Sequence, residues 1–175
     1  MSRTIKTEAI VLKKNNNLLN KDSLITLFTE KHGKITVIAK GIKKLTSRRL
    51  PHNQTGNLIK GIIIRRGSFF YLQETELISH FSEIKKQSKK LPWFYFYFFI
   101  LDRLLPENDK ELKIYNLSKK FLIQLAKKNS NLENLTFYLN KVLRLLGYID
   151  KNLSFSEIKK TIEEIINQKL PTFII

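Results

Sequence analysis

The residue types that most often carry out chemistry are scattered along this chain. The three histidines, His32, His52 and His80, fall in or near expected turns and lack the i, i+4 spacing of a helical metal site. The nearest match to a phosphate-binding loop is residues 56–61, but Ile62 and Ile63 follow where Lys and Ser/Thr are required. We interpret the histidines as ordinary loop residues and residues 56–61 as the start of a strand.

Carboxylates and thiols offer no better catalytic site. Two clusters of acidic residues lie on polar faces of expected helices: Glu107/Asp109/Glu111 and Glu163/Glu164. Favourable interaction with a helix N-terminus and surface solubility explain them better than acid–base catalysis does. The absence of cysteine excludes disulfides, thiolate zinc sites and cysteine nucleophiles, and suits an intracellular protein. The sequence therefore predicts a protein that is not an enzyme and holds no metal or cofactor.

Charge is the strongest chemical signal in the sequence. The chain of 175 residues has 32 Lys and Arg against 15 Asp and Glu, a net charge of +17. Residues 31–73 contain no acid and ten cations: Lys31, Lys34, Lys40, Lys43, Lys44, Arg48, Arg49, Lys60, Arg65 and Arg66. Because repulsion within this segment is uncompensated, we expect a polyanionic partner, with nucleic acid favoured over an anionic membrane surface.

Aromatic residues follow the last two of these cations after two intervening residues, Gly67 and Ser68. In a strand, Phe69 and Tyr71 project to one face while Phe70 and Leu72 project to the other. One set fills a core and the other can stack on bases. We assign Phe70 to the core, whereas for Tyr71 the sequence leaves core and stacking equally open. The candidate nucleic-acid-binding residues are Lys34, Lys40, Lys43, Lys44, Arg48, Arg49, Lys60, Arg65, Arg66 and Tyr71.

The elements that would position these residues are strands over the first 80 residues. Short β-rich stretches separated by breakers lie at 7–14, 23–29, 34–40, 58–66 and 69–77. His32-Gly33 and Arg66-Gly67-Ser68 suit tight hairpins. Five short strands with one long loop predict a small closed barrel, because closure removes exposed sheet edges. An open five-stranded sheet covered by later helices is the alternative.

Helical periodicity replaces strand alternation after Phe81. We expect helices over residues 93–105, about 108–128 and about 132–146, with Gly147 as a left-handed cap. Ser154 and Glu157 resemble a capping box that opens a last helix, closed by Pro171. The basic segment 80–91 is a short helix or a linker. The fold class is therefore α+β, with a barrel domain at 1–81 and an all-α domain at 82–175.

The stretch from Trp93 to Leu105 is apolar nearly all round. A helix of this kind is usually buried, so we expect it at the centre of the helical domain, also contacting the barrel. Its longest apolar run, residues 93–101, is far shorter than the roughly 20 residues of a bilayer span. The N-terminus has no apolar stretch long enough for a signal peptide. We expect a soluble cytoplasmic protein without a membrane partner.

Several motifs resemble the RecO family of bacterial recombination mediators. They are EAIVLKK (8–14), KDSLITLFTEKHGKITVIAKGIKK (21–44), LIKGIIIRRGSFFYLQETELI (58–78) and YLNKVLRLLGY (138–148). A strand ending in Phe-Thr-Glu, a glycine hairpin and Ala-Lys-Gly follow one another as in that family. The match covers most of residues 5–81 and, more loosely, 92–150.

The resemblance implies an N-terminal OB-fold barrel and a role in DNA repair and recombination by the RecF pathway, associated with the nucleoid. Such proteins bind single- and double-stranded DNA, anneal complementary strands without ATP and, with RecR, help load RecA onto DNA coated by single-strand-binding protein. The family's DNA surface maps onto Lys40, Lys43, Lys44, Arg48 and Arg49.

Three departures from the family pattern are visible. Many members carry a four-cysteine zinc site after the Leu-Gly-Tyr helix, and this chain has no cysteine, so we expect a short form without zinc. Typical members also continue with further helices beyond the point where this sequence stops. Where the family often has basic residues, this chain has Thr136-Phe137, and Lys141 and Arg144 are candidates to replace them in docking the acidic tail of single-strand-binding protein.

Two other functions remain as alternatives to DNA binding and annealing. One is a reduced adaptor that keeps protein contacts but has lost annealing, and the other is a general OB-type RNA-binding protein.

Overall fold

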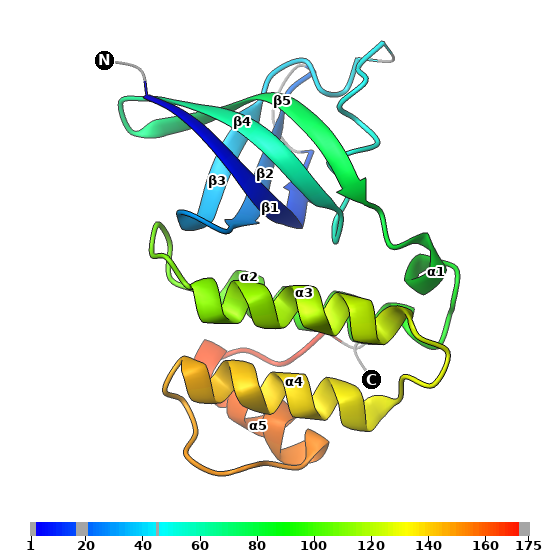
Figure 1. Cartoon of the computed structure of the whole chain (residues 1–175). Helices are drawn as coiled ribbons and strands as arrows, with labels where there is room; N and C mark the ends of the chain where they lie inside the picture. Colours follow the sequence, from blue (N-terminus) through cyan, green and yellow to red (C-terminus); the bar gives the residue numbers. More distant parts are fainter. Residues whose placement is uncertain (1–2, 17–20, 45, 172–175) are drawn as a thin grey trace. The chain divides into compact units, whose positions relative to one another are not determined.

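A computed structural model describes residues 3–16, 21–44 and 46–171 (Figure 1). The chain divides into two compact units. The first comprises Met1–His80 with Pro106–Leu112, and the second comprises Phe81–Leu105 with Lys113–Ile175. The segment 106–112 thus groups with the strands, although it falls within the range expected for the helical domain. The boundary expected at residues 81 and 82 stays a prediction.

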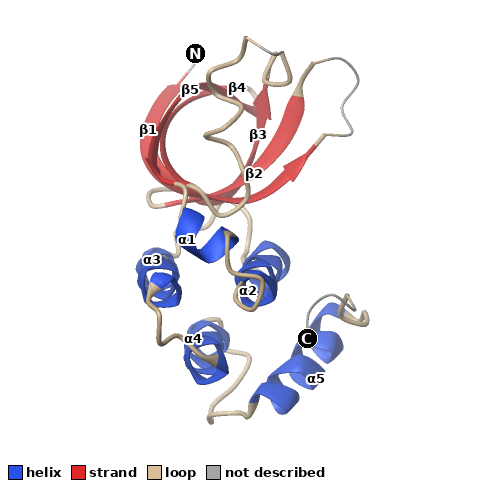
Figure 2. Cartoon of the chain, turned by 90° about the vertical axis from the view of Figure 1, so that its right-hand side faces the viewer, coloured by secondary structure: helices blue, strands red, loops and turns tan. Residues whose placement is uncertain are grey.

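The first unit is a closed barrel of five strands (Figure 2). The strands are β1 (Arg3–Asn15), β2 (Ser23–Thr29), β3 (Gly33–Ala39), β4 (Leu58–Arg66) and β5 (Phe69–Ser79). They follow the order β1-β2-β3-β5-β4, and β1 also pairs with β4. This confirms the closed barrel, and the open-sheet alternative is wrong.

Strand β1 is longer than the expected 7–14 because it closes the barrel. Its first part, Arg3–Ile10, pairs with β4, and its later part, Ala9–Asn15, pairs with β2. Closure on the other side is a short parallel pairing of β3 with β5, at Val37↔Phe70 and Ile38↔Tyr71. Since parallel neighbours need a long connection, the basic loop and β4 separate β3 from β5 in the chain.

Alternating residues of every strand fill the interior of the barrel. On β3, Ile35, Val37 and Ala39 are fully buried, whereas Thr36 between them is exposed. Phe70 and Leu77 of β5 pack against this core, which confirms the assignment of Phe70. The other buried members of the core are Ile5, Ala9, Val11, Ile25, Leu27, Ile42, Ile59, Ile63 and Leu72.

The segment 106–112 joins the barrel at the β2–β3 turn. The Asn108 amide donates to the Lys34 carbonyl at 2.8 Å, and Lys34 and Glu107 form a β-bridge. Gly33 has φ +66°, and a Cβ at this position would stand 1.6 Å from the Asp109 carbonyl oxygen. Glycine is therefore required here for both the turn and the close backbone approach.

In the second unit, the described residues form five helices: α1 (Ser82–Lys85), α2 (Leu91–Leu104), α3 (Leu112–Ala126), α4 (Leu132–Leu145) and α5 (Phe155–Ile166). Ser154 and Glu157 form the expected capping box of α5, and Gly147 has the expected left-handed conformation, φ +78°. Helix α5 ends earlier than Pro171, because Asn167 adopts a left-handed conformation and caps it.

Helix α2 supplies most of the aromatic core of this unit. Seven of its residues are buried, as its apolar sequence predicts: Phe94, Phe96, Tyr97, Phe98, Ile100, Leu101 and Leu104. Tyr97 stacks on Phe121 of α3 at 4.0 Å, and Phe96 meets Phe155 of α5 edge-on. Within the part of the chain that is described, no helix has the length and apolar character needed to cross a bilayer.

The basic segment 80–91 is a short helix, α1, followed by turns. One of its cations, Lys90, is only 4% exposed, and its Nζ donates to the carbonyls of Leu125 and Lys127. These groups lie at the C-terminal end of α3, where carbonyls lack partners and the helix dipole favours a cation. Lys90 therefore caps a helix and does not contribute to a binding surface.

Candidate nucleic-acid interface

Tyr71 lies on the outer face of the barrel between two cations. The Lys40 Nζ is 5.3 Å from the centre of its ring, and the Arg66 guanidinium carbon is 5.7 Å from it. Lys40 follows β3 and Arg66 ends β4, so the pairing of both strands with β5 brings the three residues together. Tyr71 is half-buried and is not among the residues of the barrel core, and its stacking on bases stays a prediction.

Alternation along β5 places the neighbouring aromatic residues on opposite faces. Phe69 is 60% exposed, whereas Phe70 packs against the barrel core. The adjacent arginines separate in the same way, because Arg66 approaches Tyr71 while Arg65 lies 5.7 Å from the Phe70 ring. The outer face near the β4–β5 hairpin therefore presents Phe69, Tyr71, Lys40 and Arg66, which we call the aromatic–cationic patch.

Polar side chains brace the long loop between β3 and β4, and one of them, His52, ties the loop to β5. Buried Asn57 donates to the carbonyls of Pro51 and His52 at 2.9 and 2.8 Å, and buried Asn53 donates to the Arg49 carbonyl at 2.8 Å. The His52 ring bonds to the Thr75 carbonyl at 3.0 Å. Asparagine is typical of turns, but the carbonyls that these two side chains reach depend on the folded loop and cannot be read from the sequence.

The predicted cations of this loop divide into two groups. Arg49 donates to the carbonyls of Leu72, Gln73 and Lys40, and Lys43 donates to the Asn16 carbonyl. These two side chains fasten the loop in place. Lys44 and Arg48 are exposed, which leaves their charges facing solvent.

Two further predicted cations lie away from the patch. Lys34 is only 8% exposed, and its backbone pairs with residues 107 and 108. Lys60 is exposed, but its cross-strand neighbours are Glu8 on β1 and Glu76 on β5. The segment without acids is therefore continuous in the sequence but not on the surface, because strand pairing places carboxylates of β1 and β5 beside β4.

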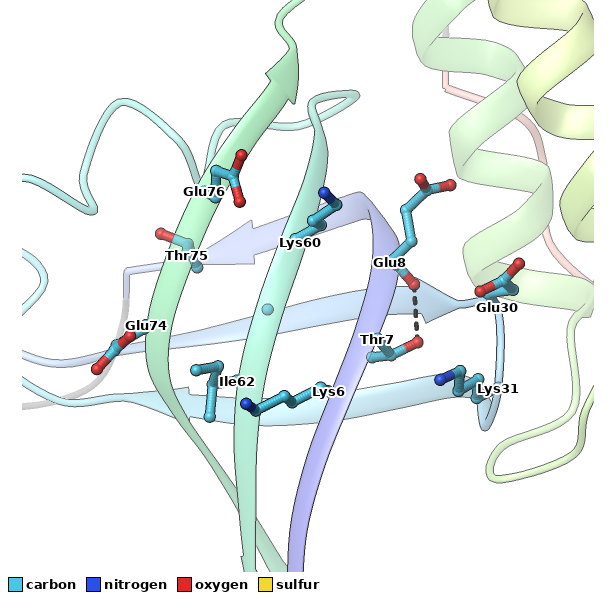
Figure 3. A pocket seen from close by; sticks show the side chains of 11 residues that line it. Lys6, Thr7, Glu8, Glu30, Lys31, Lys60, Ile62, Glu74, Thr75 and Glu76 are labelled. Carbon is cyan, nitrogen blue, oxygen red and sulfur yellow. Dashed lines mark hydrogen bonds between the residues drawn. The ribbon is translucent and has the colours of Figure 1, made fainter.

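A groove of about 500 Å³ across β1, β4 and β5 gathers these carboxylates (Figure 3). Gly61 lies in it, and its charged lining is mixed: Glu8, Glu30, Glu74 and Glu76 with Lys6, Lys31 and Lys60. Four of the five acids of residues 1–80 are in this groove, and the fifth, Asp22, accepts a hydrogen bond from the Gly41 amide at 2.7 Å. Negative charge is thus concentrated on one face of the barrel.

The barrel surface places cations beside partly exposed aromatic rings. Among the described residues, no three His, Cys, Asp or Glu side chains form a group that could hold a metal ion. Cations beside exposed aromatic rings are instead the combination that holds phosphates and stacks bases. Fold and surface together define an OB-type barrel protein with a helical second unit.

Comparison with known proteins identifies the family. Residues 1–81 match the family model for the N-terminal domain of recombination protein O. The chain is 32% identical over 148 residues to the DNA repair protein RecO of Caldanaerobacter subterraneus, which covers 84% of this chain and 60% of that protein. It is 31% identical over 160 residues to the DNA repair protein RecO of Clostridium acetobutylicum, covering 90% of this chain and 64% of that protein. The chain belongs to the RecO family, and it spans about six-tenths of the length of these curated relatives.

Proposed function

We propose that this protein acts in DNA repair and recombination by binding DNA strands and annealing complementary ones without nucleotide hydrolysis. The relatives named above are DNA repair proteins. In this proposal it works in the cytoplasm on single- and double-stranded DNA, together with RecR, single-strand-binding protein and RecA, and has no catalytic site.

The observation that carries the proposal is the position of Tyr71 between Lys40 and Arg66. Tyr71 and exposed Phe69 offer ring faces to unpaired bases, and the two cations offer charge to the phosphates that flank them. Stacking accepts every base and phosphate contact carries no sequence information, so binding at this patch is independent of sequence. Lys44 and Arg48 extend the positive surface along the loop.

Annealing of two complementary oligonucleotides tests the proposal. The Lys40→Gln/Arg66→Gln variant removes two positive charges beside Tyr71, and we expect it to slow protein-promoted annealing by about tenfold or more. Tyr71→Ala should weaken binding of single-stranded DNA by a similar factor, since one base stack contributes about 1–3 kcal/mol.

The matched control is Lys6→Gln/Lys60→Gln, which removes the same charge from the mixed groove. It should anneal like the wild type. A wild-type protein that does not accelerate annealing would contradict the proposal and favour the adaptor alternative. Tighter binding to structured RNA than to DNA would favour the RNA-binding alternative.

A groove in the helical unit supports single-strand-binding protein as a partner. It measures about 540 Å³ and includes Phe137, Lys141 and Arg144 of α4 with Phe155 of α5. Phe137 is 51% exposed, and the Lys141 Nζ lies 4.2 Å from its ring centre. An apolar floor beside two cations suits a peptide that is both acidic and apolar.

Fluorescence anisotropy of a labelled peptide from the acidic tail of single-strand-binding protein checks this assignment. Lys141→Gln/Arg144→Gln should weaken peptide binding by about tenfold, because both charge contacts are lost. The control Lys159→Gln/Lys160→Gln removes two charges from α5, neither of which lines the groove. Equal peptide affinity in the two double variants would exclude the groove as the docking site.

A further inference from the structure

A second positively charged site lies at the other side of the β4–β5 hairpin from the aromatic–cationic patch. It is a small pocket of about 130 Å³ in the barrel unit, and it takes residues from β1, the β2–β3 turn, β4, β5 and segment 106–112. The lining residues are Arg3, Ile5, His32, Arg65, Phe70 and Asn108. Its polar groups are two arginines, a histidine and an asparagine, and the described residues place no carboxylate in its lining.

The two arginines are held beside each other by strand pairing. Arg3 of β1 and Arg65 of β4 are directly opposite in the antiparallel register. Like charges at such positions repel and lower stability. Arg65 donates its Nε to the Gly67 carbonyl at 3.1 Å and lies over the Phe70 ring, so its position is fixed from two sides. Within the described residues, neither guanidinium forms an ion pair with a carboxylate.

His32 completes the positive surroundings. Its backbone amide donates to the Thr29 hydroxyl at 3.0 Å, and this hydroxyl donates to the Gly33 carbonyl at 2.9 Å, which fixes the turn. Partial burial, followed by the positive charges of Arg3, Lys31 and Lys110, lowers the pKa of His32. The three charges that lower it are cationic, and they come from β1, the turn and segment 106–112.

We propose that this pocket binds a single phosphate group, with Arg3 and Arg65 as its charge partners and His32 and Asn108 as additional hydrogen-bond donors. Arginine has the planar donor geometry that binds phosphate oxygens in pairs. A volume of about 130 Å³ admits a phosphate group but not a nucleotide with its base. An anion here would also relieve the repulsion between the two arginines. The phosphate can be free or can belong to the end of a nucleic-acid strand.

The proposal is tested by titrating the protein with sodium sulfate and with inorganic phosphate. The NMR signals of the His32 ring report binding. We expect saturable shifts that sodium chloride at equal ionic strength does not produce. Sulfate keeps its charge, whereas the lowered pKa of His32 means that its ring gains a proton only on acidification, so sulfate should bind several-fold more tightly at pH 5 than at pH 8. His32→Gln should remove the pH dependence, because it removes the titrating ring from the pocket.

The decisive variant is Arg3→Gln/Arg65→Gln, which should weaken sulfate binding by about tenfold or more. Lys6→Gln/Lys60→Gln is the matched control, since it removes two charges from the same two strands outside the pocket. Thermal unfolding without sulfate verifies that both variants fold. Unchanged His32 signals in sulfate and phosphate, or equal weakening in the two variants, would overturn the proposal.

Short oligonucleotides with and without a 5′ phosphate then identify the source of the phosphate. If only the phosphorylated strand shifts His32, the pocket binds a strand end. If inorganic phosphate shifts His32 and neither strand does, the pocket binds free phosphate. The pocket is tested with inorganic anions and without DNA. A pocket that does not bind them can therefore be distinguished from a protein that does not anneal DNA.

Discussion

Tyr97 and Ser118 form a fully buried polar pair in the helical unit. Their side-chain oxygens are 3.0 Å apart, and Ser118 also donates to the Ile114 carbonyl at 2.8 Å. Burial raises the pKa of the Tyr97 phenol well above its ordinary value, although its hydrogen bond with Ser118 acts in the opposite direction. The phenol therefore stays neutral at all working pH values and acts as a structural group.

Removing the Tyr97 hydroxyl and removing the Ser118 hydroxyl should lower the free energy of unfolding by different amounts. In Tyr97→Phe, Ser118 keeps its bond to Ile114, so we expect a loss of about 1 kcal/mol in the free energy of unfolding. In Ser118→Ala, the buried phenol loses its partner, and the expected loss is larger, about 1–3 kcal/mol. Urea unfolding followed by the fluorescence of Trp93, the single tryptophan, measures both. A larger cost for Tyr97→Phe would contradict this assignment.

Residue roles were predictable from sequence where they depend on strand alternation. Strand alternation predicted that Phe70 faces the core, and Phe70 does pack against it. The charges of Lys40 and Arg66 predicted that both side chains are exposed, and both are. Strand partners were not predictable in the same way. Lys60 has Glu8 and Glu76 beside it only because β1 and β5 flank β4, and these glutamates are distant in the sequence.

Among elements, the β2–β3 turn has a second role besides reversing the chain. The close approach of the Asp109 carbonyl to Gly33 makes it the docking point of segment 106–112. The sequence predicted the hairpin at His32-Gly33 but assigned residue 108 to the start of a helix. Helix α3 begins instead at Leu112, because residues 107 and 108 pair with β3.

Alanine substitutions at Gly33 and Gly67 should distinguish the cost of a positive φ angle from the cost of a collision between the new Cβ and the Asp109 backbone. Gly33 and Gly67 have similar positive φ angles, +66° and +58°, but a Cβ on Gly67 meets nothing within 4 Å. Gly67→Ala should cost about 1 kcal/mol from conformation alone. Gly33→Ala should cost about 1–3 kcal/mol more, because the Cβ collides with backbone.

Amide hydrogen exchange supplies the local measurement for this pair. The Asn108 amide, which donates to the Lys34 carbonyl, should lose protection in Gly33→Ala and keep it in Gly67→Ala. Equal stability and equal protection in the two variants would show that segment 106–112 does not depend on contact with Gly33.

At the scale of the whole chain, the distribution of charge matters more than its total. The net charge of +17 indicates a polyanionic partner, but most of the acids of the barrel region gather in one mixed groove. The residues of the aromatic–cationic patch and the exposed loop cations all lie between Glu30 and Glu74. This part of the sequence contains no carboxylate. This separation of charge, and not the high pI alone, is what we expect to direct a DNA strand to one face of the barrel.

The salt dependence of binding to a single-stranded oligonucleotide shows whether the aromatic–cationic patch is the DNA-binding surface. If about five phosphates are neutralised, the logarithm of the binding constant should fall with the logarithm of the salt concentration at a slope near −3.5. Lys40→Gln/Arg66→Gln should reduce the magnitude of that slope by about 1.4, since two phosphate contacts are lost, and Lys6→Gln/Lys60→Gln should leave it unchanged. A flat salt response, or the same change of slope in both variants, would contradict the assignment of the patch as the DNA-binding surface.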